Sequence, residues 1–221
     1  VMKNVAGFDV ARLMTGALGT LGVITEVSLK CLPLPKAETT LVQECAADAA
    51  IHLVNEWGGQ PLPLSATCYH DGHLYVRLSG APPAVSAAGA RLGGRVLADA
   101  EAFWAAVRDH RHPFFAPSLA DGVPLWRLSV KSTAPYHNFG GEQLVEWGGA
   151  LRWLRGVDKG NAAKLRDWAA AQGGHATLFR AGGRDVPVFQ PLDATMAALH
   201  RRLQSVFDPH GILNPGRLLP A

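Results

Sequence analysis

The chain has 221 residues, of which 48% are apolar and 18% charged, and its formal net charge is +3. This composition is sufficient for a sizeable core and excludes general disorder. No block of five or six like charges and no run of 18 apolar residues occurs, so we expect no nucleic-acid partner and no transmembrane segment.

The three cysteines, Cys31, Cys45 and Cys68, are widely spaced and odd in number. This pattern argues against a disulfide framework and against a structural zinc site. We therefore expect buried thiols in a reducing compartment and no metal site.

The first 33 residues are punctuated by glycine and then become strongly β-forming. From Val23 to Lys30 the alternation and the β-branched residues predict a strand with one buried face. Pro33 and Pro35 then mark a boundary. The first 35 residues are therefore expected to be separate from the rest of the chain.

Residues 38–98 predict the order β-α-β-β-α-β. The helices are expected at Ala47–Trp57 and Pro82–Leu92, each closed by a glycine pair, and the hairpin turn at Asp71-Gly72. This order suggests a ferredoxin-like unit.

A short helix is expected at 100–109 and an irregular stretch at 110–123. A second set of elements then loosely repeats the first order: a strand at 125–130, a hairpin of strands at 143–147 and 150–155, a helix at 161–171 and a strand at 175–180. A last helix is expected from Asp193 to Phe207. The fold class is thus α+β, an antiparallel sheet with helices on one face.

The first phrase that could bind a ligand is the run from Gly16 to Thr25. Gly16, Gly19 and Gly22 leave backbone N–H groups bare, so a phosphate or a ring can approach closely. These glycines precede the predicted strand, unlike the dinucleotide fingerprint, which comes after a strand and opens a helix. Taken alone, a tight turn is the simpler interpretation.

A second phrase is the run from Phe207 to Arg217. Asn214 precedes Pro215, which predicts an extended backbone that would hold the amide in one direction. An amide donates and accepts, so it suits the edge of a heterocycle. A plain C-terminal turn is again the simpler interpretation of this phrase alone.

Together the two phrases are more specific. Residues 4–10 (NVAGFDV) and 19–27 (GTLGVITEV) resemble the end of the FAD domain in vanillyl-alcohol-oxidase-type flavoproteins, which have the PCMH-type FAD fold. Residues 208–217 (DPHGILNPGR) are similar to the C-terminal signature of that family. Within it, the whole chain resembles the C-terminal part of the FAD-binding subunits of bacterial glycolate oxidases.

The resemblance implies three parts. Residues 1–35 would be a remnant of the FAD domain, residues 36–190 the cap or substrate domain, and residues 191–221 a helix and tail that return to the FAD domain. Asn214 would lie near the isoalloxazine. The full set of residues expected to line FAD is Gly16, Gly19, Thr20, Gly22, Val23, Ile24 and Asn214.

The resemblance also implies a function. The subunit would oxidise a small 2-hydroxy acid, glycolate to glyoxylate, with FAD, beside a catalytic flavin subunit and an iron–sulfur subunit. The complex would be cytoplasmic or peripheral at the inner membrane. The family's main pyrophosphate loop precedes a segment like this one, so we expect the chain alone to hold no FAD and to be inactive.

Two alternatives stay open. The chain could be a non-catalytic assembly or electron-relay module of the complex, or belong to an FAD-linked oxidase of another alcohol. The related catalytic subunits carry a His-x-His-x-Gly-Asp-Gly-Asn phrase, where residues 174–183 (GHATLFRAGG) keep only His175. His175 could act as the base that takes the hydroxyl proton, or be a strand-start histidine with a structural role.

Two further groups of side chains need an interpretation. The basic cluster of Arg108, His110, Arg111 and His112 could bind a carboxylate or be a solvated loop. Trp147 and Trp153 flank a hairpin and are expected to be cross-strand core.

Overall fold

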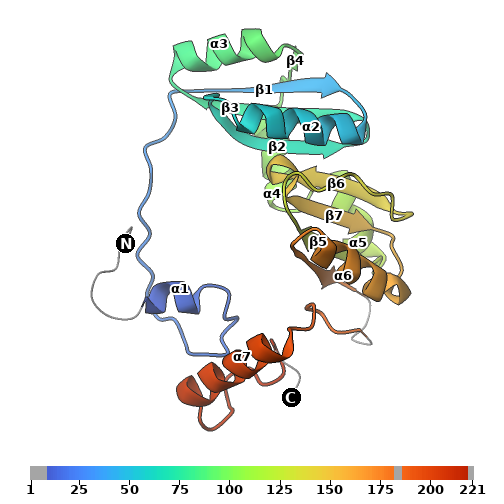
Figure 1. Cartoon of the computed structure of the whole chain (residues 1–221). Helices are drawn as coiled ribbons and strands as arrows, with labels where there is room; N and C mark the ends of the chain where they lie inside the picture. The colour runs from blue at the N-terminus through green and yellow to red at the C-terminus, as the bar shows by residue number, and fades with distance from the viewer. Residues whose placement is uncertain (1–8, 182–185, 219–221) are drawn as a thin grey trace. The chain divides into compact units, whose positions relative to one another are not determined.

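The computed structural model of the chain describes residues 9–181 and 186–218 (Figure 1). Residues 4–8 of the first resembling run, and residues 182 and 183, therefore lie outside the described residues. The chain divides into two compact units. The smaller unit contains the chain up to Leu32 and again from Pro191, and the larger unit spans Pro33–Gln190.

The larger unit is built on a sheet that has eight strands in the described residues, in the order β4-β1-β3-β2-β6-β7-β5-β8. Every neighbouring pair is antiparallel. The strands are β1 (Ala37–Glu44), β2 (Leu64–His70), β3 (His73–Gly80), β4 (Arg95–Val96), β5 (Leu125–Ser129), β6 (Glu142–Glu146), β7 (Leu151–Arg155) and β8 (His175–Arg180).

Helices connect these strands and form much of the smaller unit. They are α1 (Val10–Met14), α2 (Ala47–Gly58), α3 (Pro82–Leu92), α4 (Ala100–Arg108), α5 (Ala116–Ala120), α6 (Ala162–Ala171) and α7 (Ala194–Phe207). Short 3-10 turns are η1 (Pro113–Phe115), η2 (Trp147–Gly149) and η3 (Lys159–Asn161). The predicted α+β class with an antiparallel sheet is confirmed.

The first four strands form the predicted ferredoxin-like half, with spatial order β4-β1-β3-β2. The turn between β2 and β3 lies where it was predicted, and Asp71 and Gly72 have φ values of 47° and 74°. Positive φ at both positions is typical of a two-residue hairpin turn that matches strand twist. Leu74, Val76 and Leu78 alternate inward from β3 and pack under α2 and α3.

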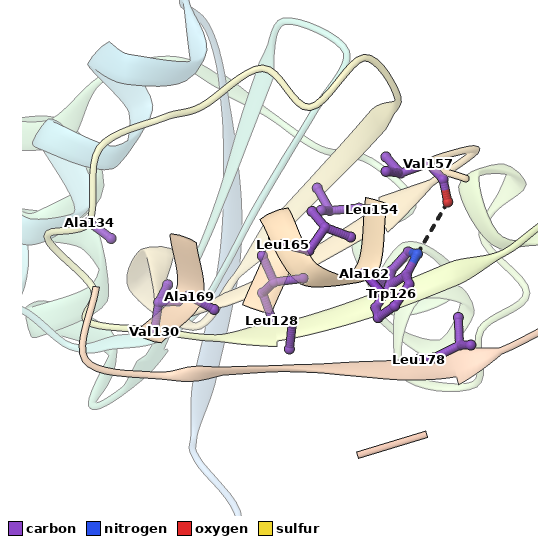
Figure 2. Packing of buried hydrophobic residues seen from close by; sticks show 11 residues of the cluster. Trp126, Leu128, Val130, Ala134, Leu154, Val157, Ala162, Leu165, Ala169 and Leu178 are labelled. Carbon is purple, nitrogen blue, oxygen red and sulfur yellow. Dashed lines mark hydrogen bonds between the residues drawn. The ribbon is translucent and has the colours of Figure 1, made fainter. Parts of the chain in front are cut away.

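The last four strands repeat this arrangement in reverse order, β6-β7-β5-β8. The pairing of β2 with β6, with Cys68 opposite Glu146, joins the two halves into one sheet. Helix α6 packs on the second half through Leu165 and Ala169, which contact a cluster that includes Trp126 (Figure 2). The Trp126 indole N–H donates to the carbonyl of Val157 at 3.2 Å, so its buried polar atom is satisfied.

The opposite face of the sheet is partly covered by α4 and η1. Val107, Phe114 and Phe115 are buried there against strand residues that include Leu144 and Trp153. The stretch 110–123, predicted to be irregular, therefore contains η1 and α5. The phenylalanines of η1 are adjacent in sequence and show no helical period, so the sequence pattern did not predict these elements.

Two predictions on apolar residues are wrong. Val23–Lys30 forms no strand, and Val23 and Val27 are exposed. An alternating pattern shows that one face of a segment is apolar, but a strand also needs a neighbouring strand to pair with. No strand pairs with this segment in the described residues. Trp153 is core as predicted, whereas Trp147 is 68% exposed because it belongs to the η2 turn and not to a strand.

A loop between β5 and β6 occupies the place that a helix has in the first half, and Arg152 of β7 holds it. The side chain of Arg152 has no exposed surface. It donates to the carbonyls of Gly149 at 3.1 Å and Pro135 at 2.7 Å, and also to that of Ala134. Burial lowers its pKa to about 10, which still leaves the guanidinium charged near neutral pH.

We expect Arg152→Met to lower the free energy of unfolding by about 3 kcal/mol, because several buried carbonyls lose their donors at once. The measurement is a denaturant titration. Arg111→Met, at an exposed arginine of the same unit, should change stability by less than about 0.5 kcal/mol. Equal effects of the two changes would show that the buried donors do not hold the loop.

Candidate functional site

The candidate site lies in the smaller unit, where the glycine phrase and the tail phrase meet. The tail comes after α7, whose first turn is capped by the Asp193 carboxylate through the N–H of Met196 at 2.9 Å. Asp208 ends the helix and is buried. Its carboxylate accepts from the N–H groups of Ile212 at 3.1 Å and Leu213 at 2.7 Å, so the tail is folded into a fixed loop.

The glycine phrase comes after α1 as a pair of tight turns. The N–H of Ala17 donates to the carbonyl of Met14 at 3.2 Å, and the N–H of Thr20 donates to that of Ala17 at 3.0 Å. The buried Thr20 hydroxyl also donates to the Ala17 carbonyl, at 2.7 Å. Thr20 therefore stabilises the turn from within.

Asn214 connects the two phrases across 196 residues of sequence. Its amide N–H donates to the carbonyl of Leu18 at 3.0 Å. Gly19 makes this approach possible, because a Cβ there would lie 2.7 Å from Asn214 Nδ2. Gly19 also has a φ of 73°, which favours glycine.

The backbone of Asn214 differs from the prediction. Its φ is 46°, in the left-handed region and not the extended one. Asparagine tolerates this region, and a turn in which the N–H of Arg217 donates to the Asn214 carbonyl at 3.1 Å accompanies it. Within the described residues, the amide oxygen and the second amide N–H of Asn214 have no partner, so both can meet a ligand.

A cleft of about 420 Å³ opens at this junction. Its lining residues are Met14, Ala17, Gly19, Gly22, Val23, Ile24, Ile212, Leu213 and Asn214. The volume falls in the range of about 300–1,000 Å³ that is usual for ligand pockets, and a mostly apolar wall with one polar group is typical of them.

The cleft brings together most of the residues predicted from the sequence. Gly19, Gly22, Val23, Ile24 and Asn214 line it, whereas Gly16 and Thr20 do not. Sequence reasoning missed Met14, Ala17, Ile212 and Leu213. The apolar pair at 212–213 was the only available signal, since an apolar pair in a polar tail has to dock against something.

The other candidate residues belong to the larger unit and do not converge on one point. His175 is exposed at the start of β8, opposite Ser129. Arg108 and Arg111 both pair with Asp109, at 2.8 Å and 2.7 Å, and their hydrogen bonds hold the pKa of its carboxyl far below the usual range. This pairing favours the solvated-loop interpretation of the two arginines.

The two histidines of that loop are partnered inside the protein. His110 stacks on Phe115 with ring centroids 4.3 Å apart, and a guanidinium nitrogen of Arg180 lies 3.1 Å from its Nδ1. His112 Nδ1 accepts from the N–H of Phe114 at 3.2 Å, which caps η1.

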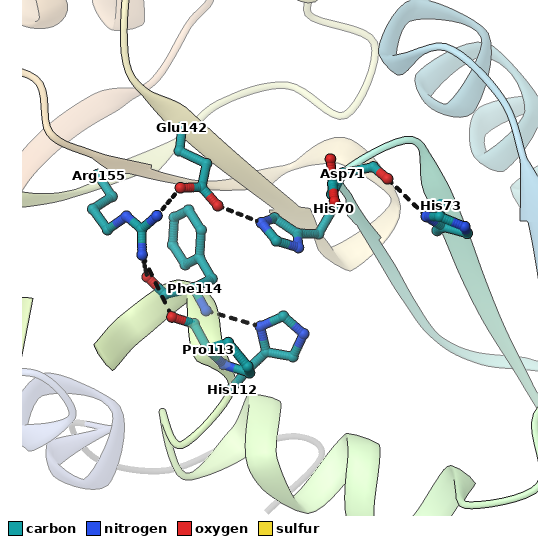
Figure 3. Close-up of polar contacts among 8 residues, drawn as sticks. All are labelled: His70, Asp71, His73, His112, Pro113, Phe114, Glu142 and Arg155. Carbon is teal, nitrogen blue, oxygen red and sulfur yellow. Dashed lines mark hydrogen bonds and ion pairs between the residues drawn. The ribbon is translucent and has the colours of Figure 1, made fainter. Parts of the chain in front are cut away.

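His112 also faces a polar cluster that the sequence did not reveal (Figure 3). Its ring lies 5.2 Å from that of His70, whose Nε2 is 2.8 Å from a Glu142 oxygen. Arg155 pairs with the other Glu142 oxygen and donates to the Phe114 carbonyl at 2.8 Å. The cluster thus ties β2, β6 and β7 to η1.

Burial lowers the pKa of both His70 and His112. Arg155 adds to the effect on His70, although Asp71 opposes it, and His70 adds to the effect on His112. Burial therefore favours the neutral form of both imidazoles. No group of three or more His, Cys, Asp or Glu side chains suited to a metal ion occurs among the described residues.

One family model and several known proteins match the chain. Residues 190–218, which contain α7 and the tail, match the family "FAD linked oxidases, C-terminal domain". Over 99% of its length the chain is 44% identical to the glycolate oxidase subunit GlcE of Escherichia coli (strain K12). The chain is similar to the FAD-linked oxidases over nearly its whole length.

Shorter matches to other known proteins also occur. Over 40 residues, 18% of the chain and 8% of the relative, it is 48% identical to the glycolate oxidase subunit GlcD of Bacillus subtilis (strain 168). Over 42 residues, 19% of the chain and 9% of the relative, it is 45% identical to a D-lactate dehydrogenase of Anaerostipes hadrus. The chain spans 59% of the length of GlcE.

No helix in the described part of this chain is long and apolar enough to cross a membrane.

Gly19→Ala should separate the two phrases, because the new Cβ would displace the Asn214 amide. Gly16→Ala is a matched control: its φ of 82° is equally unfavourable for alanine, but nothing lies within 4 Å of the added Cβ. We expect Gly19→Ala to cost about 1 kcal/mol more than Gly16→Ala, the value of one hydrogen bond, in denaturant titrations. Equal costs would show that Asn214 adapts freely.

The histidine cluster predicts that stability falls in mild acid. A neutral histidine with a lowered folded pKa contributes stability above its unfolded pKa, about 6.5, and this stability is lost as the pH falls through the folded pKa. We expect the free energy of unfolding to decrease from about pH 7 to about pH 5. His112→Asn, whose amide oxygen can also cap η1, should reduce the slope. An unchanged slope would contradict the role of His112.

Proposed function

We propose that the chain is the C-terminal part of an FAD-linked subunit that oxidises a 2-hydroxy acid, glycolate to glyoxylate, within a multi-subunit complex. The names of the relatives support the class of reaction. The observation that carries the proposal is the junction of Asn214 with Gly19, which leaves amide groups of Asn214 free at the edge of an apolar cleft.

The residues present fit part of a flavin. A planar ring needs a flat apolar wall, which Gly22, Val23 and Ile24 supply, and a polar edge, which Asn214 supplies. Gly16 and Thr20 would not contact the ring but would stabilise the turn that positions the lining residues. When bound, FAD supplies the two-electron acceptor for oxidation of an alcohol to a carbonyl.

The division of the chain supports the corresponding domain assignment. In this proposal the smaller unit is the part of the FAD domain that residues 1–35 and 191–221 contribute, and residues 36–190 are the cap or substrate domain. The compact units change over after Leu32 and after Gln190, close to these limits.

The proposed partners are a catalytic flavin subunit and an iron–sulfur subunit, in the cytoplasm or at the inner membrane through the complex. The occurrence of two differently named glycolate oxidase subunits among the relatives supports an assembly of this kind.

An electron-relay or assembly role is the second candidate. It is favoured by residues 174–183, where His175 is the only histidine and no acidic residue remains. The proposed base, His175, is exposed on β8, and its imidazole has no hydrogen bond to another described residue. Nothing in the described chain therefore orients this imidazole.

The test uses the full-length subunit. Asn214→Ala should weaken flavin binding about tenfold, because a free amide edge is worth about 1.4 kcal/mol. The measurement is the flavin absorbance retained per protein during dilution. Asn138→Ala, at a turn of the larger unit where Asn138 caps Gly140, is the control. Unchanged retention in Asn214→Ala would overturn the assignment of the cleft.

Addition of glycolate without oxygen then separates the two candidate functions. Bleaching of the flavin, lost in His175→Gln, supports oxidation by this subunit. A bound flavin that glycolate does not reduce supports the relay or assembly role. The 221-residue chain by itself should show no stoichiometric flavin spectrum.

A further inference from the structure

The larger unit contains a second and larger cavity, of about 1170 Å³, on the sheet face that α4 covers. Strands β1, β2 and β3 contribute to its floor, α4 to one wall, and the η2 turn to its rim. Its chemistry is set by two residues for which the fold alone gives no reason, Trp147 and Arg127.

Trp147 has an unfavourable backbone conformation. Its φ is 52°, in a region that bulky residues rarely adopt, and the residue is 68% exposed. Strain of this kind persists only where the surroundings impose it, and it is concentrated at functional sites.

The surroundings of Trp147 do impose its conformation. The N–H of Gly148 donates to the hydroxyl of Thr67 at 2.8 Å. Asn55 of α2 donates to the carbonyls of Gly148 at 3.3 Å and Ser132 at 3.0 Å. The turn is thus fixed from two sides, and the largely exposed Trp147 lines the cavity.

Arg127 provides a charged guanidinium whose hydrogen-bond donors are unused. Its guanidinium lies over the ring of Trp153, 5.9 Å from the centroid. Among the described residues it has no hydrogen bond and no carboxylate within 4 Å. A half-buried guanidinium with this many unused donors is suited to a bidentate anion.

Glu146 also lines the cavity. Its carboxylate could in principle occupy the donors of Arg127 in place of a ligand. Its carboxylate accepts from the Trp153 indole at 2.7 Å. Burial raises the pKa of this carboxyl, although the indole hydrogen bond and the charge of Arg127 oppose the shift. Glu146 is therefore directed to Trp153 and leaves the donors of Arg127 open.

The other cations of the cavity are already engaged. Arg108 pairs with Asp109. Arg77 lies over Trp104 and donates through Nε to Ser65 at 2.9 Å. The cavity therefore offers open guanidinium donors at Arg127 and a free aromatic face at Trp147.

We infer that this cavity binds a carboxylic acid that carries an aromatic ring, with the carboxylate on Arg127 and the ring against Trp147. Aromatic pairs and bidentate arginine–carboxylate pairs are the matching interactions. The inference goes beyond the proposed flavin function, because the binding needs neither a flavin nor a reaction.

The experiment is a titration of the whole chain, without flavin, with phenyllactate as the probe and tryptophan fluorescence as the readout. We expect saturable binding at least about tenfold tighter than that of glycolate, which lacks the ring. Phenylpropanediol, which lacks the carboxylate, and phenethylamine, which carries a cation, should both bind at least about tenfold more weakly.

Variants test the two contacts. Arg127→Gln should weaken phenyllactate binding at least about tenfold, and Trp147→Gly should do so while relieving the backbone strain. Arg111→Gln, at an exposed arginine paired with Asp109, is the charge control and should bind as the wild type does. Unfolding curves identify any variant that is misfolded, and Arg127→Lys, which keeps the charge, should then show an intermediate affinity.

Absence of saturable binding, equal affinity in Arg127→Gln, or tighter binding of phenethylamine would each overturn the inference. None of these results bears on the flavin cleft, since no flavin is present in the titration.

Discussion

The smaller unit depends on one hydrogen bond, from the Asn214 amide to the Leu18 carbonyl. It joins segments from opposite ends of the chain, and it forms only because Gly19 leaves room for the amide. The bond is exposed and by itself contributes only about 1 kcal/mol. Its importance is geometric, because it holds two short loops at the distance that creates the cleft. The buried carboxylate of Asp208 preorganises one of these loops.

The larger unit meets a different constraint, the joining of two ferredoxin-like halves along β2 and β6. Each half covers one face of its strands with helices, but the second half has a loop where the first has α2. Arg152 replaces the packing of that helix with buried hydrogen bonds to the loop. Asn55 of α2 reaches the same loop at Ser132, so side-chain hydrogen bonds connect the two halves in addition to the strand pairing.

Sequence periodicity predicted the helices and strands whose stabilising contacts lie within one segment. It failed where an element needs a pairing strand from elsewhere in the chain. Helices α2 and α3 and the β2–β3 hairpin were predictable because caps, glycines and alternation lie within each segment. Val23–Lys30 alternates in the same way but has no neighbouring strand in the described residues. The glycines and Asn214 of the cleft could be named from the resemblance, whereas Met14 and Leu213 could not, because only the folded loops bring them together.

The arginines show why charge in a sequence does not identify a binding site. Arg108 stands in a basic run yet is occupied by Asp109, and Arg152 is isolated in sequence yet fully occupied by carbonyls. Arg127 gives no sequence signal, but the fold leaves its donors unused beside a cavity. A ligand can satisfy hydrogen-bond donors that the protein leaves unpaired. Clustering of cationic residues in the sequence does not identify such donors. The same argument selects the free amide edge of Asn214 over the internally bonded hydroxyl of Thr20.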